Sequence, residues 1–465
     1  MNGIWAFLFA MREELLLFSG FWIIVSGVDD IAVDLIWAWR AGWRRLTRYR
    51  LVPPMRAGEL PIAARTGLLA IFIPAWQESA VIGNMLARCT DSWQNSAIEH
   101  RIYVGCYGND PASIAAVVEV ALSSRNIRLV LCDKPGPTTK ADCLNRLWRA
   151  LTADELAGGY KAKAIILHDA EDDVHPLELR VMHYLIERAA AVQLPVIPVQ
   201  VKGSAWISGH YCDEFAEAHA KTLVVRESLG AAVPLAGVGC AIERNRLGRI
   251  AIAHNGNPFD ADSLTEDYEL GLHIGAEGGK VIFARLLDAD GHLVGTRACF
   301  PHSFEAATRQ KARWMTGIAL AGWDRLGWHG GVAEYWMRLR DRKALLAALV
   351  LVTAYMCIIL TVLLMLADVA GLYQVPDSSD TVLLFLVLTM LLLLWRSAVR
   401  FICVLAVQGW RQAWLSIPRN VVANIINIVA ARRAATDYVR LLAGGKLQWD
   451  KTDHSHFPDK ASQHG

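Results

Sequence analysis

The chain has 465 residues, too many for one small domain, and its formal net charge of +2 gives no strong field that would attract nucleic acid. Hydrophobic residues make up 54% of it and the mean hydropathy is +0.28, both high for a soluble protein, so we expect membrane segments beside a large folded domain. Its nine cysteines form no CxxC pair, which argues against a disulfide framework and a structural zinc site. Dispersed free thiols are typical of the reducing cytoplasm.

Residues 15–39 form the first long apolar stretch, which is long enough to cross a membrane as a helix. Three carboxylates interrupt it, Asp29, Asp30 and Asp34, and a carboxylate at mid-bilayer costs about 2.5–3.5 kcal/mol. A spanning helix therefore needs a protein partner for these acids or places them near one membrane face; the alternative is an interfacial helix. The start of the chain lacks a basic region and a small-residue cleavage site, so we do not expect a signal peptide.

From about residue 66 onward, short apolar runs alternate with stretches of helical periodicity, which predicts an α/β domain. Continuous apolar strands separated by helices indicate a mainly parallel sheet covered on both faces, with ligands bound beyond the carboxyl ends of the strands. The predicted strands are residues 67–75, 101–108, 127–132, 164–170, 194–201 and 280–287, and the clearest predicted helices are residues 112–124 and 140–152.

Polar and aromatic residues follow several of these strands. Trp76 and Glu78 follow the first strand and Asp110 follows the second. Lys140 begins the helix after the third strand. An aromatic ring, carboxylate acceptors and a lysine along one edge of a sheet are the mixture that recognition of a nucleotide diphosphate needs. For Asp110, an ordinary turn at the end of a strand is the alternative.

The acidic stretch HDAEDDVHP, residues 168–176, follows the apolar run AIIL. At the end of a strand, residues i and i+2 point to the same side, so Asp169 and Glu171 can face one cation, for which we expect Mg²⁺ or Mn²⁺. A solvated turn is the alternative. We expect Asp172 and Asp173 to cap or solvate the following turn, and the two histidines to be structural rather than zinc ligands.

Two further apolar stretches follow this domain, residues 345–367 and residues 381 to about 407, and each is long enough to span a membrane. Lys and Arg cluster after the first span, before the second and after the third, and the loop between the second and third has none. This predicts an outside N-terminus, a short outside loop, and an inside location for residues 40–343 and the C-terminus. Residues 413–442 mix apolar residues with arginines at helical spacing, so they either lie in the inner membrane interface or pack on the α/β domain. Pro418 marks a kink or a helix start.

Six motifs stand in order between about residues 65 and 335: IPAWQE, KADCLN, DAED, GVGCAIER, TEDYELG and RQKARW. Together they resemble the family 2 glycosyltransferases with the GT-A fold. The segment HDAEDDVHPLELR and the tail WDKTDHSHFP are most similar to the bacterial phage-adsorption-protein-B-like group of membrane glycosyltransferases. Longer members of that group carry a C-terminal regulatory domain that binds cyclic-di-GMP; this chain ends at Gly465, so we expect it to lack that domain and direct control by that nucleotide.

The resemblance implies an inverting glycosyltransferase that moves a sugar from a UDP-sugar to a growing polysaccharide or a lipid-linked acceptor. It implies that Asp267 is the general base and that Asp169 and Glu171 hold the metal ion, with Glu171 in place of the usual second aspartate. The alternatives are a helix N-cap for Asp267 and core packing for Trp314. The remaining assignments are Trp76, Glu78, Asp110, Lys140, Gln310 and Arg313 at the nucleotide and diphosphate, and Glu266 and Trp314 at the acceptor.

By this interpretation the chain is a multi-pass protein of the bacterial inner membrane with its catalytic domain in the cytoplasm. The expected partners are a UDP-sugar, a glycan or lipid-linked acceptor, membrane lipid, and an export partner or a second copy of the chain, but no nucleic acid. Two alternatives stay open: a transferase of single sugars to a lipid carrier, and a non-catalytic membrane scaffold or phage-entry component. The predicted parts are residues 1–40, a membrane or interfacial segment; 41–343, the GT-A domain; 344–408, two membrane helices; and 409–465, a cytoplasmic or interfacial segment.

Overall fold

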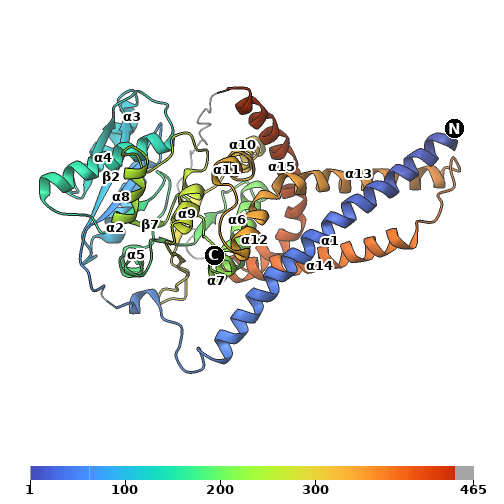
Figure 1. Ribbon diagram of the computed structural model, residues 1–465, viewed down its shortest axis with the longest axis horizontal. Coiled ribbons are helices and arrows are strands. Elements are labelled where there is room, and N and C mark those ends of the chain that lie inside the picture. The colour runs from blue at the N-terminus through green and yellow to red at the C-terminus, as the bar shows by residue number, and fades with distance from the viewer. Residues whose placement is uncertain (1, 62, 446–465) are drawn as a thin grey trace.

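The computed structural model describes residues 2–61 and 63–445, and these residues form two connected parts (Figure 1). One part is an α/β domain, and the other is a bundle of long helices that extends away from it. The N-terminus lies at the far end of this bundle, beside the loop that joins two of its helices. The tail motif WDKTDHSHFP lies outside the described residues.

A seven-stranded sheet forms the centre of the α/β domain, with the strand order β3-β2-β1-β4-β7-β5-β8. Neighbouring strands are parallel except around β7, which runs antiparallel to both β4 and β5. This confirms the predicted mainly parallel sheet. Its strands are β1 (Leu69–Pro74), β2 (His100–Tyr107), β3 (Ile127–Cys132), β4 (Ala164–Leu167), β5 (Ala191–Gln193), β7 (Cys240–Glu243) and β8 (Val281–Phe283).

Two hydrophobic cores lie on opposite faces of this sheet because its central strands are apolar on both sides. All six residues of β1 are buried. Ile71 packs into one core with helices α2 (Ile82–Trp93) and α3 (Pro111–Ala121). Phe72, the next residue, packs into the other core with α4 (Lys140–Gly158). The two-residue period of a strand therefore sends alternate side chains of β1 into different cores.

Three strands were not predicted: β5, β7 and β9 (Thr296–Cys299). The predicted strand at residues 194–201 exists, but it is not part of the central sheet, because β6 (Val196–Val199) pairs with β9 in a separate two-stranded sheet. β5 has three residues and β7 has four. Runs this short carry no clear periodicity, and their pairing is decided by contacts distant in sequence.

The other helices of this domain cover the sheet and connect it to the long helices (Figure 1). Two helical segments contain a π turn, one running from α6 through η3 into α7 and one from α10 through η4 into α11. The bounds are η1 (Ala57–Glu59), α5 (Glu178–Leu185), η2 (Ile186–Arg188), α6 (Ile207–Glu217), η3 (Ala218–Thr222), α7 (Leu223–Ser228), α8 (Arg244–Ala253), α9 (Glu266–Ala276), α10 (Phe304–Met315), η4 (Thr316–Leu320), α11 (Ala321–Leu326) and α12 (Val332–Arg342).

Three described helices are long and apolar enough to cross a membrane: α1 (Asn2–Leu46), α13 (Ala344–Val369) and α14 (Asp380–Gln408). They coincide with the three predicted spans, and α1 packs against both of the others. Gly20 of α1 lies so close to Phe385 of α14 that a Cβ at position 20 would come within 2.8 Å of the ring. Small residues allow such close approach between membrane helices.

Charged side chains gather at both ends of this bundle. At the end distant from the α/β domain, the Arg12 guanidinium lies 2.6 Å from Glu13 and donates to Ser378 at 2.7 Å. At the near end stands Asp29, and the helical rise from Arg12 to Asp29 is about 25 Å. This length is close to the roughly 30 Å of a bilayer's hydrocarbon core.

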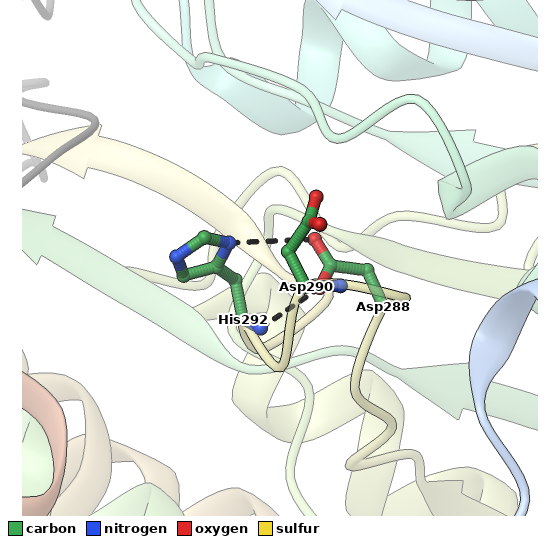
Figure 2. A group of neighbouring side chains, drawn as sticks. All are labelled: Asp288, Asp290 and His292. Atoms are coloured by element: carbon green, nitrogen blue, oxygen red, sulfur yellow. Dashed lines mark hydrogen bonds and ion pairs between the residues drawn. The ribbon is translucent and has the colours of Figure 1, made fainter.

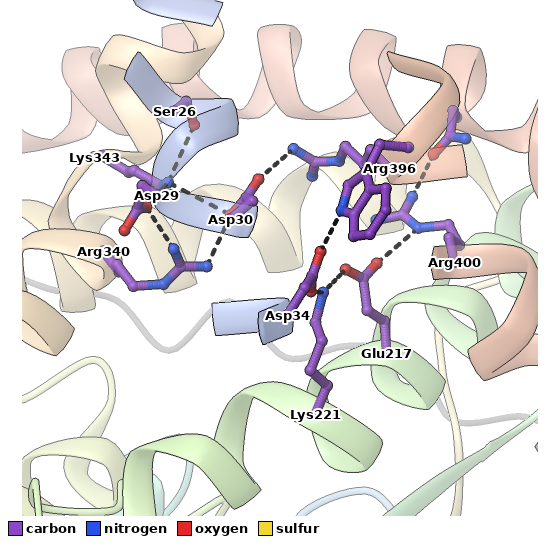
Figure 3. Close-up of polar contacts among 12 residues, drawn as sticks. Ser26, Asp29, Asp30, Asp34, Glu217, Lys221, Arg340, Lys343, Arg396 and Arg400 are labelled. Carbon is purple, nitrogen blue, oxygen red and sulfur yellow. Dashed lines mark hydrogen bonds and ion pairs between the residues drawn. The ribbon is translucent and has the colours of Figure 1, made fainter. Parts of the chain in front are cut away.

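The acids that interrupt the first apolar stretch have protein partners at the near end of the bundle (Figure 3). The Lys343 ammonium lies 2.6 Å from Asp29. Arg340 pairs with Asp29 and, at 2.8 Å, with Asp30. Arg396 of α14 lies 3.1 Å from Asp30. These two aspartates therefore meet the condition stated for a spanning helix, because basic residues of α12, of the N-cap of α13 and of α14 neutralise them.

Asp34 connects α1 to the α/β domain. Its carboxylate lies 2.6 Å from the Lys221 ammonium in η3, and Lys221 also lies 2.8 Å from Glu217. Arg400 of α14 pairs with the same Glu217 at 2.9 Å. This chain of ion pairs joins α1 and α14 to α6 and η3, which fixes the domain against the bundle (Figure 3).

The last described helix, α15 (Trp410–Leu442), packs on α10, α6 and α14. Arg419 is 1% exposed and donates to the carbonyl of Ala205 at 2.8 Å and to Asp213 at 3.2 Å. Packing on the α/β domain is therefore the alternative that the structure supports for this segment. Pro418 lies inside α15 and does not start it.

Candidate active site

The turn after β4 brings two carboxylates to the edge where the parallel strands end. The Asp169 side chain is 32% exposed and Glu171 is 5% exposed. Asp172 Oδ1, next in sequence, is buried without a hydrogen-bond partner among the described residues. Carboxylate oxygens in this setting fit the ligand preference of Mg²⁺ or Mn²⁺.

The buried ring of His168 hydrogen-bonds to the acidic turn. Its Nδ1 lies 2.9 Å from Asp172 Oδ2 and its Nε2 lies 2.7 Å from Glu178 Oε1, with the ring fully buried. Burial opposes ionisation of the ring, but the two carboxylates outweigh it and raise the pKa of His168 to about 10. Asp172 also accepts the backbone N–H of Asp169 at 3.0 Å, so it caps the turn as predicted. Neither Asp172 nor Asp173 is solvated, since they are 1% and 5% exposed.

Helix α4 delivers a lysine to this turn. Its N-cap is Thr139, whose hydroxyl accepts a backbone N–H of the first turn at 3.2 Å, and Lys140 is its first residue. The Lys140 ammonium lies 2.5 Å from Asp169 Oδ1. Burial alone would lower the pKa of the ammonium, but the charges of three carboxylates, those of Asp169, Glu266 and Asp267, raise it. Lys140 therefore stays a cation between the acidic turn and α9.

Asp267 is the second residue of α9, and Thr265 is the N-cap. The N-cap alternative for Asp267 therefore does not hold. Its Oδ1 accepts the N–H of Tyr268 at 2.8 Å. A Cβ on Gly237, which has φ +72°, would come within 2.5 Å of Asp267 Oδ2, so the glycine in GVGCAIER leaves room for this carboxylate. Burial raises the pKa of Asp267 although Lys140 opposes the shift.

Helix α10 brings Arg313 close enough for its charge to act on Glu266 and Asp267. Burial and the charge of Asp267 raise the pKa of Glu266 to about 7. The positive charge of Arg313 opposes the raised pKa values of both Glu266 and Asp267. Gln310 Oε1 and Arg313 Nε are buried without hydrogen-bond partners among the described residues. A Cβ on Gly317, just after α10, would come within 2.6 Å of Thr265 Oγ1. The segment that follows the RQKARW motif therefore packs directly on the threonine of the TED motif.

Trp314 has a different environment from its neighbours on α10. Its ring lies 6.1 Å from Tyr211, edge to face, and 6.4 Å from both Phe215 and Phe300, measured between centroids. These contacts favour the core-packing alternative for Trp314 over an acceptor platform.

Trp76 and its surroundings form a small aromatic cluster beside the site. Trp76 is 8% exposed and packs edge-on against Tyr107 with ring centroids 5.1 Å apart. Gly136, in the loop before α4, lies against the face of Trp76, where a Cβ would come within 2.5 Å of the ring. The loop that leads to Lys140 is therefore packed onto Trp76.

Asp110 and Glu78 are buried at the ends of β2 and β1, at 6% exposure each. Asp110 accepts the backbone N–H of Gln77 at 2.6 Å and that of Ser113 at 3.3 Å, the second as the N-cap of α3. The N–H of Glu78 donates to the Ser113 hydroxyl at 2.9 Å. These bonds give Asp110 the turn-forming role that was its alternative.

A cavity of about 610 Å³ adjoins the site and was not predicted. One wall is the segment before α9, which Asn145 of α4 holds: the N–H of Phe259 donates to Asn145 Oδ1 at 3.0 Å, and Asn145 Nδ2 donates to the Phe259 carbonyl at 2.7 Å. Asn145 is the last residue of the KADCLN motif, so this motif was the sequence signal that could have indicated the cavity wall. The lining includes Tyr107, Cys132, Thr138, Asp142 and Glu266.

A second group with metal-ligating side chains, Asp288, Asp290 and His292, lies in the turn between β8 and β9 (Figure 2). Asp288 accepts the backbone N–H groups of Asp290 at 3.0 Å and His292 at 2.8 Å. The His292 side chain is 71% exposed. The grouping therefore follows from the hydrogen bonds of a solvated turn.

Comparison with known proteins agrees with this geometry. Residues 66–317 match the model of the family described as glycosyltransferase like family 2. Bacteriophage adsorption protein B of Escherichia coli strain K12 and bacteriophage N4 adsorption protein B of E. coli O157:H7 are each 35% identical over 460 residues, covering 94% of this chain. The chain spans 61% of the length of these relatives.

Among solved structures, a mannosyltransferase from Pyrobaculum calidifontis in complex with GDP-mannose and Mn²⁺ is similar in fold. It superposes with a TM-score of 0.53 at 14% sequence identity, covering 92% of this chain and 99% of the other. The similarity extends over the helical bundle as well as the α/β domain, since it covers most of both chains.

Proposed function

Because this chain belongs to glycosyltransferase family 2 and its α/β domain has the GT-A fold, we propose that it is a membrane-bound inverting glycosyltransferase. It moves a sugar from a UDP-sugar to a growing polysaccharide or a lipid-linked acceptor. The observation that carries this proposal is the position of the Lys140 ammonium, which lies 2.5 Å from Asp169 and interacts with the charges of Glu266 and Asp267.

Asp267 is the proposed general base. Its carboxylate is buried, stands at the start of α9, and has room beside Gly237. A raised pKa makes the carboxylate a better proton acceptor for an acceptor hydroxyl as the glycosidic bond forms. With a single base and no covalent nucleophile, the acceptor attacks from the face opposite the leaving UDP, so the anomeric configuration inverts.

The leaving diphosphate meets positive charge from the protein. Lys140 and Arg313 supply it, and Arg313 Nε is a buried donor without a hydrogen-bond partner among the described residues. Asp169 and Glu171 would hold Mg²⁺ or Mn²⁺, which acts as a Lewis acid on the phosphates when bound. Trp76 and Asp110 then border the nucleoside at the ends of β1 and β2.

The helical bundle favours an acceptor made or held at the membrane surface. Asp34, Lys221 and Glu217 fix the α/β domain to the cytoplasmic ends of the proposed membrane helices. Helix α10, which carries Arg313, packs on α15 next to this junction. A lipid-linked acceptor would therefore lie close to the proposed base.

Three Asp→Asn variants test the proposal on full-length protein in detergent, by UDP release from a panel of UDP-sugars with Mg²⁺ or Mn²⁺. We expect Asp267→Asn to lower the rate by about 10²–10⁴-fold, the usual contribution of a general base, while UDP still binds. We expect Asp169→Asn to raise the metal concentration for half-maximal rate at least about tenfold. The matched control Asp290→Asn, from the exposed acidic turn, should change neither value.

The same variants can contradict each part of the proposal separately. Unchanged UDP release in Asp267→Asn would remove Asp267 as the base. A metal requirement that moves in Asp290→Asn and not in Asp169→Asn would transfer the metal site to the exposed turn. Replacing the UDP-sugars by GDP-sugars tests the nucleotide, since the P. calidifontis enzyme was solved with GDP-mannose.

A second candidate function follows from the names of the E. coli relatives, which refer to bacteriophage adsorption. In this case the chain is a membrane component of phage entry, with or without catalysis. Expressing Asp267→Asn in a strain that lacks the gene separates the two: restored phage adsorption without UDP release would favour the scaffold role. Loss of both would tie phage adsorption to the glycan that the enzyme makes.

A further inference from the structure

Two cysteine thiols lie against each other beside the proposed site. Cys132 is the last residue of β3, and Cys143 is in the first turn of α4. Their sulfur atoms are 3.7 Å apart. The strand and the helix that carry these cysteines are both well anchored. β3 pairs with β2 along six residues, and Thr139 caps the start of α4.

The two thiols differ in exposure. Cys143 is fully buried, and its sulfur occupies the space that a side chain at position 105 would take, since a Cβ on Gly105 would collide with it. Its thiol also lies 3.6 Å from the carbonyl of Gly105. Cys132 is only partly buried and lines the cavity of about 610 Å³, so small molecules can reach it.

Their acidities differ in the same sense. The hydrogen bond with Cys143, supported by the charge of Arg146, lowers the pKa of Cys132. The same hydrogen bond and burial raise the pKa of Cys143. A reachable thiol that ionises readily, next to a second thiol, is the arrangement found in redox-sensitive cysteine pairs.

We propose that Cys132 and Cys143 form a modification site, at which Cys132 attacks a low-molecular-weight disulfide and Cys143 then closes an intramolecular disulfide. In the first step the Cys132 thiolate bonds to one sulfur of the small disulfide and releases the other half as a thiolate. In the second step Cys143 gives its proton to solvent, attacks Cys132 and releases the second small thiol. The two sulfurs must approach from 3.7 Å to about 2.05 Å.

Closure of this disulfide acts on the proposed catalytic machinery through α4. Cys143 lies one turn after Lys140, and its sulfur packs in one cluster with Trp76 and Tyr107. Drawing Cys143 toward β3 shifts this turn and with it the ammonium that pairs with Asp169. We expect oxidation to lower UDP release at least about tenfold, because small misplacements of positioning groups have effects of this size or larger.

The experiment treats the full-length protein in detergent with oxidised glutathione, followed by blocking of free thiols and trypsin digestion. Trypsin cuts after Lys140, between the two cysteines, so the disulfide links residues 129–140 to residues 141–146 and is seen directly by mass spectrometry. We expect this linked pair in the wild type and its loss after dithiothreitol. In Cys143→Ser, glutathione should remain attached to Cys132. In Cys132→Ser, no glutathione should become attached at position 132.

Cys89→Ala is the matched control, since Cys89 is fully buried in α2 and its sulfur lies 3.6 Å from the sulfur of Met85. It should form the 132–143 disulfide as the wild type does. Absence of the linked peptides from folded, oxidised wild type would overturn the proposed site. The activity readout rests on the proposed function: linked peptides with unchanged UDP release overturn only the effect on catalysis, and an enzyme inactive before oxidation refutes the proposed function alone.

Discussion

Burial raises the pKa of Asp267, and burial together with the charge of Asp267 raises the pKa of Glu266 to about 7. The folded chain therefore binds protons at these two carboxyl groups more tightly than the unfolded chain does. This proton binding stabilises the fold fully at pH values below the unfolded pKa values, 3.8 for Asp267 and 4.5 for Glu266. The stabilisation is lost as pH rises toward about 7. A general base must be ionised, so the enzyme becomes active over the range in which this stability is lost.

The pH dependence of kcat/KM tests this pair. The groups whose charges act on it are Lys140, Arg313 and Asp169. We expect kcat/KM for the UDP-sugar to fall as pH decreases through the raised pKa of Asp267, because protonation removes the base. In Glu266→Gln the acidic limb should stay in place, because burial, and not the charge of Glu266, raises the pKa of Asp267.

Glu277→Gln, at the exposed C-terminal end of the same helix, is the control and should leave the pH profile unchanged. A limb that moves or disappears in Glu266→Gln would mean that Glu266, and not Asp267, controls it. A folding measurement at each pH excludes unfolding as the cause of lost activity.

At this scale the sequence indicated which residues would meet, but not what surrounds them. Asp169, Lys140 and Asp267 were predictable because they belong to motifs with a fixed order. The burial of Asp172 depends on His168 and on Glu178, which lies ten residues after His168 in the sequence, and no spacing rule predicts this contact. Solvent exclusion is a property of the packed site, so sequence reasoning could predict that Asp172 caps or solvates the turn but not that it is buried.

At the scale of elements, the contact between α1 and α14 depends on the absence of side chains. Gly20 faces Phe385, and Gly27, two turns later on the same face, lies within 2.7 Å of Leu392 as measured from an ideal Cβ. We expect Gly20→Leu to destabilise the bundle by about 1–3 kcal/mol, the usual cost of overpacking. The measurement is the thermal unfolding midpoint of the purified protein in detergent.

Gly42→Leu is the control for this change, because Gly42 is in the same helix and nothing lies within 4 Å of an ideal Cβ there. Both substitutions gain helix propensity over glycine, so only their difference reports packing. An equal midpoint for the two variants would contradict the close α1–α14 contact.

Long elements were predictable and short ones were not. The three spans and the helices 112–124 and 140–152 correspond to α1, α13, α14, α3 and α4, because apolar periodicity accumulates over many residues. β5 and β7 were missed because each gains its place from pairing: β7 inserts antiparallel between β4 and β5. Local sequence carries little information about such long-range pairing.

At the scale of the whole molecule, charge is distributed so that one orientation in a membrane is favoured. Asp29, Asp30 and Asp34 are neutralised by basic residues at the end next to the α/β domain. Arg44 and Arg45 close α1 on that same side. The loop between α13 and α14, at residues 370–379, contains no Lys or Arg. By the positive-inside rule, we therefore predict that the α/β domain faces the cytoplasm.

Labelling of single added cysteines with a membrane-impermeant maleimide tests this orientation in whole cells. We expect Gln374→Cys, in the exposed loop between α13 and α14, to react in intact cells, and Ser123→Cys, exposed after α3, to react only after the membrane is opened. The background should be low because seven of the native cysteines are buried and two are partly buried. The reverse pattern would place the proposed active site outside, where a charged nucleotide sugar made in the cytoplasm does not reach it, and would therefore contradict both the topology and a UDP-sugar as donor.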